Sequence, residues 1–455
     1  MQACPRRQDR SAAAAFAAVF LAGLLGACAS SGVSRLPPGA VAGIDVLHQT
    51  VEITPFPVEG GLTGTQTIDF RPTAAGDRLR FRGGPLEIRS LALDAHPVSG
   101  WTAQDGTVDI PLARPLVPGR RHTLSLTYEA APGRGFRRSA DLAWSTYFTC
   151  DWMLCDQEDF ADRFTVDLTV QTPPGMLTLG PGVHVATTRP GPDTALHHWR
   201  TTEAYPAYVH AFVAGRLERH KPASGCTTQL EVLTTAPADR VAAIFGPTCA
   251  MLSYFEGRAG VPYPAEAYSQ LYVPDRWEAQ EAISHSTLGG GAVEALIADP
   301  SEDWAVAHEL AHQWWGNRIT AATLGEFWLN EGVVTFMVAS WKEHRWGRAA
   351  YDREIELARA RWHRCRTDWR DVPLAFDGPY PSLTARRCVQ YSKAAVFLHE
   401  LRQQMGDAAF WAGLGRFTVV NLGRAVTSRD LEHAMQRASD ADLRPLFADW
   451  VDTRP

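Results

Sequence analysis

The chain has 455 residues, of which 45% are hydrophobic and 21% are charged, a composition typical of a globular protein with two or three domains. Its formal net charge is −6, which argues against a basic nucleic-acid-binding surface, so we expect no nucleic-acid partner.

The N-terminus resembles a targeting segment rather than part of the fold. A cluster of arginines precedes an apolar run, 12–25, that is too short to span a bilayer comfortably. The run ends in Leu25-Gly-Ala-Cys28, which resembles a bacterial lipobox. We therefore expect residues 1–27 to be a lipoprotein signal peptide and Cys28 to carry a lipid that anchors the chain to the cell envelope without spanning it. Ala29 favours the outer membrane, facing the periplasm. An ordinary signal peptide is the alternative.

The next part of the chain has the pattern of a β domain. Residues 28–43 are rich in Ser, Gly, Pro and Ala and are expected to form a tether. From residue 44 to about residue 219, short alternating runs are separated by turn residues. Clear examples are Leu79–Arg82, Thr123–Tyr128 and Phe164–Val170. We expect an N-terminal domain of antiparallel sheets over 44–219.

The remaining chain, 220–455, has mainly helical patterning. Apolar periodicity predicts helices over 236–257, 300–316, 325–344, 348–365, 391–405 and 428–449. The segment Gln270–Pro274 is expected to be an edge strand. These two domains together give an α+β fold class.

Six cysteines remain once the signal segment and Cys28 are set aside. An even number favours disulfides in an exported protein. The simplest of the fifteen connectivities is sequential, pairing Cys150 with Cys155, Cys226 with Cys249, and Cys365 with Cys388.

The predicted helix 300–316 carries His308-Glu-Leu-Ala-His312. Residues four apart on a helix share a face, so the two imidazoles can converge on one metal ion. Together with a carboxylate from Glu331 in the following helix, they form a ligand set suited to Zn²⁺. Glu309 can then take a proton from a zinc-bound water, as in the H-E-x-x-H metalloproteases.

The alternative interpretation is a capped core helix without metal. Asp299 is expected to be the N-cap of this helix, with Pro300 at its first position and Glu302 completing a capping box. Gly316-Asn317 is expected to end it. A carboxylate in a Trp- and Val-rich helix such as that of Glu331 needs a partner, however, which favours the metal site.

Three segments together resemble the alanyl aminopeptidase family of gluzincin metallopeptidases, which includes leukotriene hydrolase. They are His308–Asn317 (HELAHQWWGN), Trp328–Gly332 (WLNEG) and Val389–Lys393 (VQYSK), and weaker matches extend over 44–455. The resemblance implies a saddle-like β domain followed by a thermolysin-like catalytic domain with one Zn²⁺ per chain. It also implies that amino-terminal residues are hydrolysed from peptides.

The resemblance also assigns roles to residues outside the zinc motif. Tyr391 matches the tyrosine that donates a hydrogen bond to the developing oxyanion. The family strand G-x-M-E-N, whose Glu holds the substrate amine, corresponds here to Glu278-Ala-Gln-Glu281-Ala282. We expect Glu281 to bind the substrate ammonium, with Glu278 as the fallback.

Glu278 and Ala282 differ from the Gly and Asn of the family pattern, so alternatives remain. These are a zinc endopeptidase or other amide hydrolase, and a catalytically silent binding protein. The match stops with the catalytic domain. We therefore expect a cleft that is either more open than in members with a helical C-terminal domain or closed by a partner protein.

Overall fold

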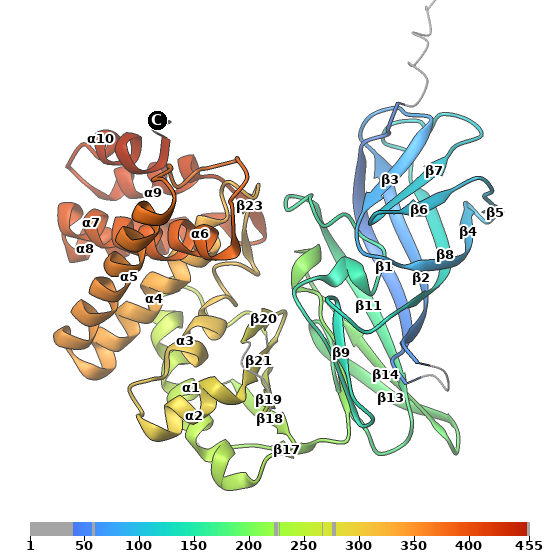
Figure 1. Ribbon diagram of the computed structural model, residues 1–455, viewed down its shortest axis with the longest axis horizontal. Coiled ribbons are helices and arrows are strands. Elements are labelled where there is room, and N and C mark those ends of the chain that lie inside the picture. The colour runs from blue at the N-terminus through green and yellow to red at the C-terminus, as the bar shows by residue number, and fades with distance from the viewer. Residues whose placement is uncertain are drawn as a thin grey trace, which may run out of the picture. The chain divides into compact units, whose positions relative to one another are not determined.

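The structure is a computed structural model that describes residues 40–56, 60–222, 226, 228–265, 267–274 and 279–452. From Pro38 onward the chain forms one compact unit. The predicted signal segment, the lipid site at Cys28, most of the tether and Glu278 lie outside the described residues. Below, residues 44–219 are called the β half and the residues that follow them the helical half (Figure 1).

A nine-stranded sheet dominates the β half, in the order β13-β14-β11-β1-β2-β8-β4-β5, with β15 also paired to β11. Its strands are β1 (Ile44–Thr54), β2 (Leu62–Pro72), β4 (Glu87–Leu93), β5 (His96–Pro97), β8 (His122–Ala130), β11 (Arg163–Thr172), β13 (Val183–Gly191), β14 (Thr194–Arg200) and β15 (Tyr205–Pro206). Buried and more exposed residues alternate along β8 and β11, the period-two pattern that the sequence shows.

Two smaller sheets complete the β half. They contain β3 (Arg78–Arg82), β7 (Thr107–Pro111) and β6 (Thr102–Gln104), and β12 (Leu177–Leu179), β16 (Val213–Gly215), β10 (Leu142–Ser145) and β9 (Phe136–Arg138). The prediction of an N-terminal β domain is confirmed. One pairing in the large sheet departs from the expected antiparallel arrangement, because β1 and β11 run parallel.

The helical half begins with a five-stranded sheet in the order β17-β18-β19-β21-β20. The strands are β17 (Glu218–His220), β18 (Gln229–Thr234), β19 (Ala267–Val273), β21 (His285–Gly289) and β20 (Gln280–Ala282). The expectation of an edge strand at Gln270–Pro274 is wrong. β19 lies in the middle of the sheet with a parallel neighbour on each side, which explains why most of its side chains are buried.

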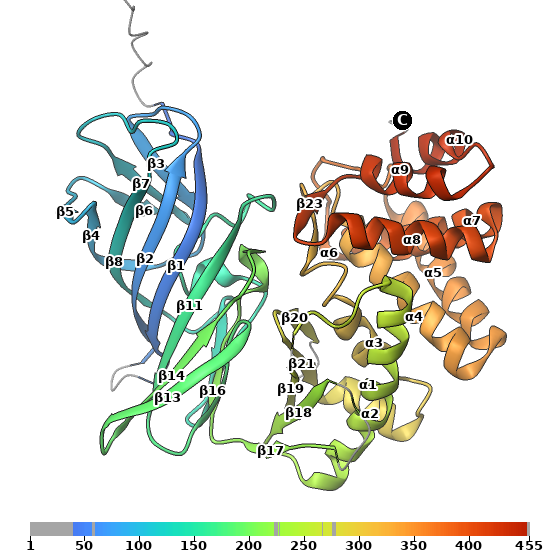
Figure 2. The same ribbon diagram turned by 180° about the vertical axis from the view of Figure 1, so that it is seen from behind.

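Helices make up most of the remaining chain, with a short strand pair formed by β22 (Ile319–Ala321) and β23 (Arg424–Val426) (Figures 1 and 2). The helices are α1 (Ala238–Ala259), α2 (Gly290–Ala298), α3 (Trp304–Ala311), α4 (Trp328–Trp346), α5 (Arg348–Asp368), α6 (Leu383–Arg387), α7 (Ala394–Met405), α8 (Asp407–Asn421), α9 (Ser428–Ala438) and α10 (Arg444–Phe447). A π-helical segment, Cys388–Lys393, joins α6 to α7, and a second one, Ala448–Asp452, follows α10.

The predicted start of the zinc-motif helix is wrong. Asp299 ends α2 instead, and its side chain accepts a hydrogen bond from the backbone N–H of Ser301 at 2.8 Å. α3 begins at Trp304, and its N-cap residue, Asp303, makes no side-chain cap bond. The Pro300 turn thus separates two helices rather than opening one. α2, α6 and α8 were not predicted, and the helix expected over 428–449 is broken between α9 and α10.

Three disulfides join the cysteines in the sequential pattern: Cys150–Cys155, Cys226–Cys249 and Cys365–Cys388. Among the residues that the structure describes, no helix combines the length and the apolar character needed to cross a membrane.

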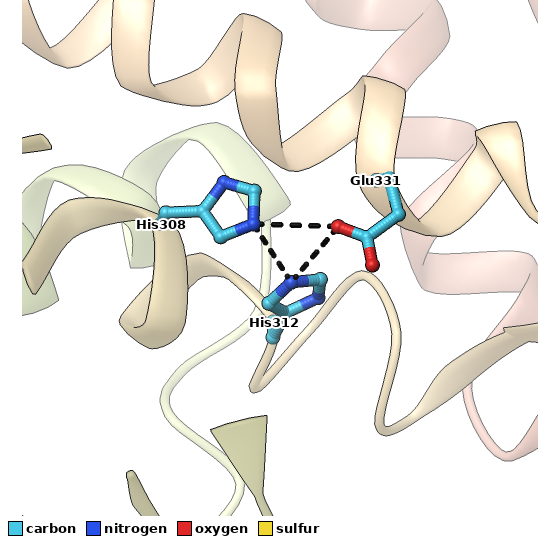
Figure 3. A group of neighbouring side chains, drawn as sticks. All are labelled: His308, His312 and Glu331. Carbon is cyan, nitrogen blue, oxygen red and sulfur yellow. Dashed lines mark hydrogen bonds and ion pairs between the residues drawn. The ribbon is translucent and has the colours of Figure 1, made fainter. Parts of the chain in front are cut away.

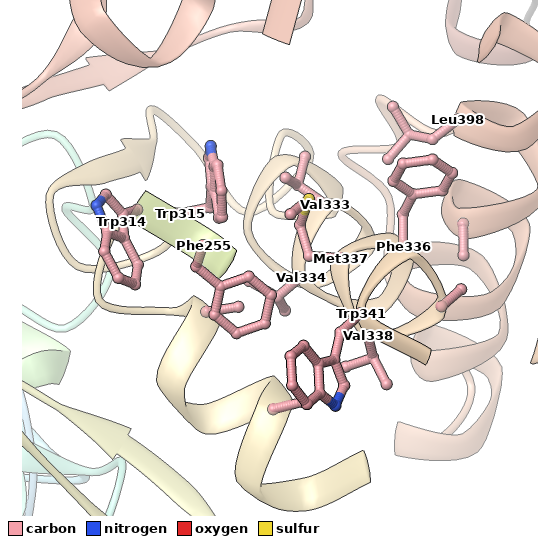
Figure 4. Close-up of a cluster of buried hydrophobic side chains, with 14 of the residues drawn as sticks. Phe255, Trp314, Trp315, Val333, Val334, Phe336, Met337, Val338, Trp341 and Leu398 are labelled. Carbon is pink, nitrogen blue, oxygen red and sulfur yellow. The ribbon is translucent and has the colours of Figure 1, made fainter. Parts of the chain in front are cut away.

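The two halves have separate hydrophobic cores and share two small clusters, one of which packs Tyr205 and Tyr208 against Ile283 and Phe327. α4 lies at the centre of the core of the helical half, where Val333, Phe336 and Trp341 are fully buried (Figure 4). A further buried cluster takes Leu179 and Val213 from the β half and Leu233 and Leu271 from the helical half. This shared apolar contact fixes the β half against the five-stranded sheet.

Candidate metal centre

Three buried side chains from two helices meet at one point (Figure 3). His308 belongs to α3, His312 follows its last turn with helical dihedral angles, and Glu331 lies in the first turn of α4. Their exposed fractions are 3%, 1% and 6%, respectively. The two Nε2 atoms lie 3.2 Å apart. Glu331 Oε2 is 3.3 Å from Nε2 of His308 and 3.5 Å from Nε2 of His312.

These separations fit a tetrahedral zinc ion. Bonds of about 2.0–2.1 Å in a tetrahedral shell place neighbouring ligand atoms about 3.3–3.4 Å apart. The observed triangle has edges of 3.2, 3.3 and 3.5 Å. The donor set of two imidazoles and one carboxylate leaves a fourth position for water or substrate, as catalytic zinc sites require. The residues present therefore fit the ion that the sequence predicts.

The imidazole rings are oriented by their surroundings. Nδ1 of His312 donates to the backbone carbonyl of Trp315 at 3.0 Å, so Nε2 is the nitrogen that faces the other ligands. The ring of His308 stacks between Trp304 and Tyr391, with centroid distances of 4.3 and 5.7 Å. Packing on both faces holds this ring in position.

The electrostatics of the cluster favour a cation. Burial lowers the pKa of His308 to about 4, so its imidazole is neutral, the form that ligates metals. Burial also acts on His312, but the nearby carboxylates, Glu281 first among them, outweigh it and raise its pKa to about 10. Three buried carboxylates surround these imidazoles, and such a cluster is stabilised by a positive charge at its centre.

Glu309 projects from the same helix as the first ligand. Its carboxylate, the carboxylate of Glu281 and a ring nitrogen of His312 all lie within 4.8 Å of one another. Burial raises the pKa of Glu309 well above its usual range, and the charge of Glu281 adds to this effect. Raised proton affinity is what a general base at a hydrolytic centre needs.

Tyr391 faces the centre from the π-helical segment Cys388–Lys393. Short π-helical segments occur frequently at functional sites. Burial raises the pKa of Tyr391 well above its usual range, and the charge of Glu331 adds to the shift. The phenol thus keeps its proton at neutral pH and can donate it in a hydrogen bond.

Glu281 lies on β20, one strand of the hairpin β20–β21, and is 7% exposed. Burial raises its pKa to about 6. The structure brings this predicted anchor to the metal centre. Glu278, the fallback, lies outside the described residues.

Two positioning residues escaped the sequence analysis although they belong to the motif His308–Asn317. Nε2 of Gln313 donates to the carbonyl of Ala282 at 2.9 Å, and Nδ2 of Asn317 donates to the same oxygen at 3.0 Å. Oε1 of Gln313 also accepts from the backbone N–H of Ser284 at 3.1 Å. The segment that carries the zinc ligands therefore also holds the hairpin of Glu281. The amide side chains of Gln313 and Asn317, which follow H-E-x-x-H in the sequence, were the signal that could have identified these positioning residues.

The β half also reaches the metal centre. The hydroxyl of Tyr208 donates to the carbonyl of Gly316 at 2.8 Å and accepts from Nδ2 of Asn330 at 2.5 Å. Gly316 follows the ligand His312, and Asn330 precedes the ligand Glu331. Tyr208 therefore joins the two segments that supply the ligands, and nothing in the local sequence predicts this contact.

Comparison with known proteins places part of the chain in a family. Residues 245–450 match the Peptidase family M1 domain. This part of the chain is a peptidase family M1 domain. The structure of the chain is similar to the crystal structure of an M1 zinc metallopeptidase from Deinococcus radiodurans. The TM-score is 0.75 at 25% identity, and the match covers 91% of this chain and 95% of that one. The predicted resemblance and fold class are confirmed.

Curated relatives of the protein include aminopeptidase N of Lactococcus lactis subsp. lactis, 24% identical over 57% of this chain. A probable aminopeptidase 1 of Sulfurisphaera tokodaii is 26% identical over 49% of this chain. Leukotriene A-4 hydrolase of Xenopus laevis is 31% identical over 31% of this chain. The matched regions cover 32%, 30% and 22% of these relatives, so the chain spans about a third or less of their length.

Proposed function

We propose that this protein is a zinc aminopeptidase that removes amino-terminal residues from peptides. The observation that carries the proposal is the buried carboxylate of Glu281 beside the metal centre, within 4.8 Å of the nearest ligand atoms of Glu309 and His312. Similarity to aminopeptidase N from Lactococcus lactis subsp. lactis supports the same activity.

The spacing limits where a bound peptide can be cut. A substrate ammonium lies about 2.8 Å from a carboxylate that binds it. The α-nitrogen is separated from the carbonyl carbon of the same residue by two bonds, a span of about 2.5 Å. An ammonium on Glu281 therefore puts the first peptide carbonyl beside Glu309 and the metal ligands. Any later carbonyl would lie too far away, which favours removal of a single residue.

Each side chain then has one task in the hydrolysis. When bound by His308, His312 and Glu331, zinc supplies a Lewis acid that polarises the carbonyl and lowers the pKa of water. Glu309 accepts the proton of the attacking water and passes it to the leaving amine. Tyr391 donates a hydrogen bond to the carbonyl oxygen as negative charge develops there.

We further propose one zinc ion per chain and attachment to the bacterial cell envelope through a lipid on Cys28, at the outer membrane facing the periplasm. The two candidate ligand groups among the described residues share His312, and only that of His308, His312 and Glu331 contains both imidazoles, which supports one ion. The lipobox-like Leu25–Cys28 and three disulfides, which form in oxidising compartments, support export. Peptides are the proposed partners, and a protein that covers the centre remains an expectation. Metal analysis and metabolic labelling with a fatty acid, using Cys28→Ala as the control, test these two points.

The test of the activity compares one peptide with a free and with an acetylated amino terminus. Zinc-loaded protein should release the first residue of the free peptide and leave the acetylated one intact. In Glu281→Ala, kcat/KM for the free peptide should fall roughly a hundredfold, because an ion pair in a buried site is lost. Glu294→Ala, at an exposed position of α2, is the matched control. Equal cleavage of both peptides would support an endopeptidase instead.

A further inference from the structure

A cavity of about 510 Å³ lies between the β half and the five-stranded sheet. Its walls come from β12, β13 and β14 on one side and from β17, β18 and β19 on the other, and it contains none of the metal-centre residues. The turn of the hairpin β20–β21, at Ser284, closes part of it. The volume falls in the range of about 300–1,000 Å³ that is usual for small-molecule sites.

Positive charge is in excess among the described lining residues. The cations are Arg189, Arg219 and Lys221, and the only carboxylate among them is Glu231. Arg219 pairs with Glu231 at 3.2 Å, and Glu231 also accepts a hydrogen bond from Ser269 at 2.9 Å. Arg189 and Lys221 form no ion pair or hydrogen bond with a described side chain, so two charges remain for an anionic ligand.

The histidines of the wall do not add to this charge. Burial lowers the pKa of His197 to about 4, and its two ring nitrogens lie 3.1 Å from the hydroxyls of Thr187 and Thr172. Burial also lowers the pKa of His285 to about 4. Both rings are therefore neutral at physiological pH. Burial also lowers the pKa of the third histidine, His184, so the unpaired positive charge belongs to Arg189 and Lys221.

Part of the wall is apolar, beside the polar side chains of Thr178, Thr187, Gln229, Ser269 and Ser284. The indole N–H of Trp199 donates to Thr178 at 3.1 Å, so the polar group of this side chain is already satisfied, and its ring centroid lies 5.0 Å from that of His184. Leu179 and Leu230 line the cavity as well and are buried. These apolar side chains suit the body of an organic molecule.

We propose that this cavity binds a small organic carboxylate with an apolar body, held by Arg189 and Lys221 and packed against Trp199. Guanidinium and carboxylate groups match in shape and can form two parallel hydrogen bonds. Free amino acids and short peptides with an apolar side chain belong to this class of molecule. The proposal concerns a second site and does not depend on the activity proposed above.

Binding of N-acetyl-L-phenylalanine, measured by isothermal titration calorimetry at low salt, tests the proposal. The acetyl group removes the ammonium that Glu281 would hold, so the probe is directed away from that anchor. N-acetyl-L-phenylalaninamide, which lacks the carboxylate, should bind at least about tenfold more weakly. Combining Arg189→Ala with Lys221→Ala should weaken binding of the acid about tenfold or more, because both cations are lost. Both residues are exposed, so the variant should fold normally.

Arg216→Ala is the matched control. This arginine is exposed and precedes the lining residue Arg219 closely in the sequence. It pairs with Asp141, and neither of these two residues lines the cavity. The Arg216→Ala variant should bind N-acetyl-L-phenylalanine as the wild type does. Equal affinity for acid and amide, or equal affinity of the double variant and Arg216→Ala, would overturn the proposal. Binding that persists in the double variant but disappears when zinc is removed would place the probe at the metal centre and overturn it as well.

Discussion

The candidate metal ligands and the proposed substrate anchor are held in place by partly different physical means. His308, His312 and Glu331 project from or directly follow helices whose other faces form the largest hydrophobic core of the chain. Glu281 lies on a short hairpin that side-chain hydrogen bonds hold in addition to the packing of Ile283 and Leu288. Close packing resists small displacements, whereas a hydrogen-bonded hairpin depends on a few directional contacts.

The contacts of the hairpin come from both halves of the molecule. Gln313 and Asn317 of the helical half bind the carbonyl of Ala282. From the β half, Gly182 exchanges hydrogen bonds with Ser284, and the carbonyl of Val209 accepts from the N–H of Ile283 at 3.0 Å. Metal binding and substrate anchoring should therefore respond to different substitutions.

The largest effect is expected for the base. Glu309→Gln preserves the shape of the side chain but removes its ability to accept a proton. Turnover should fall about 10²- to 10⁴-fold while zinc remains bound, because the three ligands are intact. Steady-state kinetics and metal analysis of the same preparation measure both quantities. A rate within a few-fold of wild type would show that another group is the base.

The second-largest effect is expected for the zinc affinity, when the candidate ligand Glu331 is removed from its tightly packed helix. Glu331→Ala leaves two imidazoles and should weaken zinc binding more than about a hundredfold. Competition with a fluorescent chelator measures the affinity. Glu343→Ala, on the same helix but far along it, is the control and should bind zinc as wild type does. Unchanged zinc affinity in Glu331→Ala would mean that a different residue completes the ligand set.

A smaller effect is expected when a hydrogen bond that holds the hairpin of Glu281 is removed. Gln313→Ala removes the bonds to Ala282 and Ser284 and should lower kcat/KM for a free peptide about tenfold, with zinc affinity unchanged. Gln404→Ala, at an exposed position of α7, is the control. Loss of zinc in Gln313→Ala would show that the hairpin and the ligands are not held independently.

The smallest effect is expected where the β half touches the ligand segments. Tyr208→Phe removes the hydroxyl that joins Gly316 to Asn330 and should weaken zinc affinity by less than about tenfold. The control is Tyr128→Phe, because the hydroxyl of Tyr128 is buried and has no hydrogen-bond partner among the described residues. An identical zinc affinity in both variants would confine the role of Tyr208 to folding.

The sequence predicts the features of this protein that depend on local patterns. His308 and His312 converge because a helix repeats about every 3.6 residues. The β half follows from period-two alternation, as in β8 and β11. The sequential pairing of the cysteines also agrees with the structure.

Features that depend on contacts between distant residues were not predictable in this way. The bond from Tyr208 to Gly316 spans 108 residues, and the bond from Gln313 to Ala282 spans 31. The start of α3 was wrong because the Asp299 carboxylate binds a turn N–H whether or not a helix follows. β19 was placed at an edge because its parallel neighbours lie elsewhere in the sequence.

The disulfide between Cys365 and Cys388 has a consequence for how the protein matures. Cys388 opens the π-helical segment that carries Tyr391, and Cys365 belongs to α5. The backbone three residues before Tyr391, the proposed oxyanion donor, is thus covalently tied to a helix that supplies none of the candidate metal ligands. A chain synthesised in a reducing cytosol would form this disulfide only after transfer to an oxidising compartment. For the exported chain proposed above, oxidation is therefore an assembly step for the proposed catalytic tyrosine, and recombinant production has to provide it.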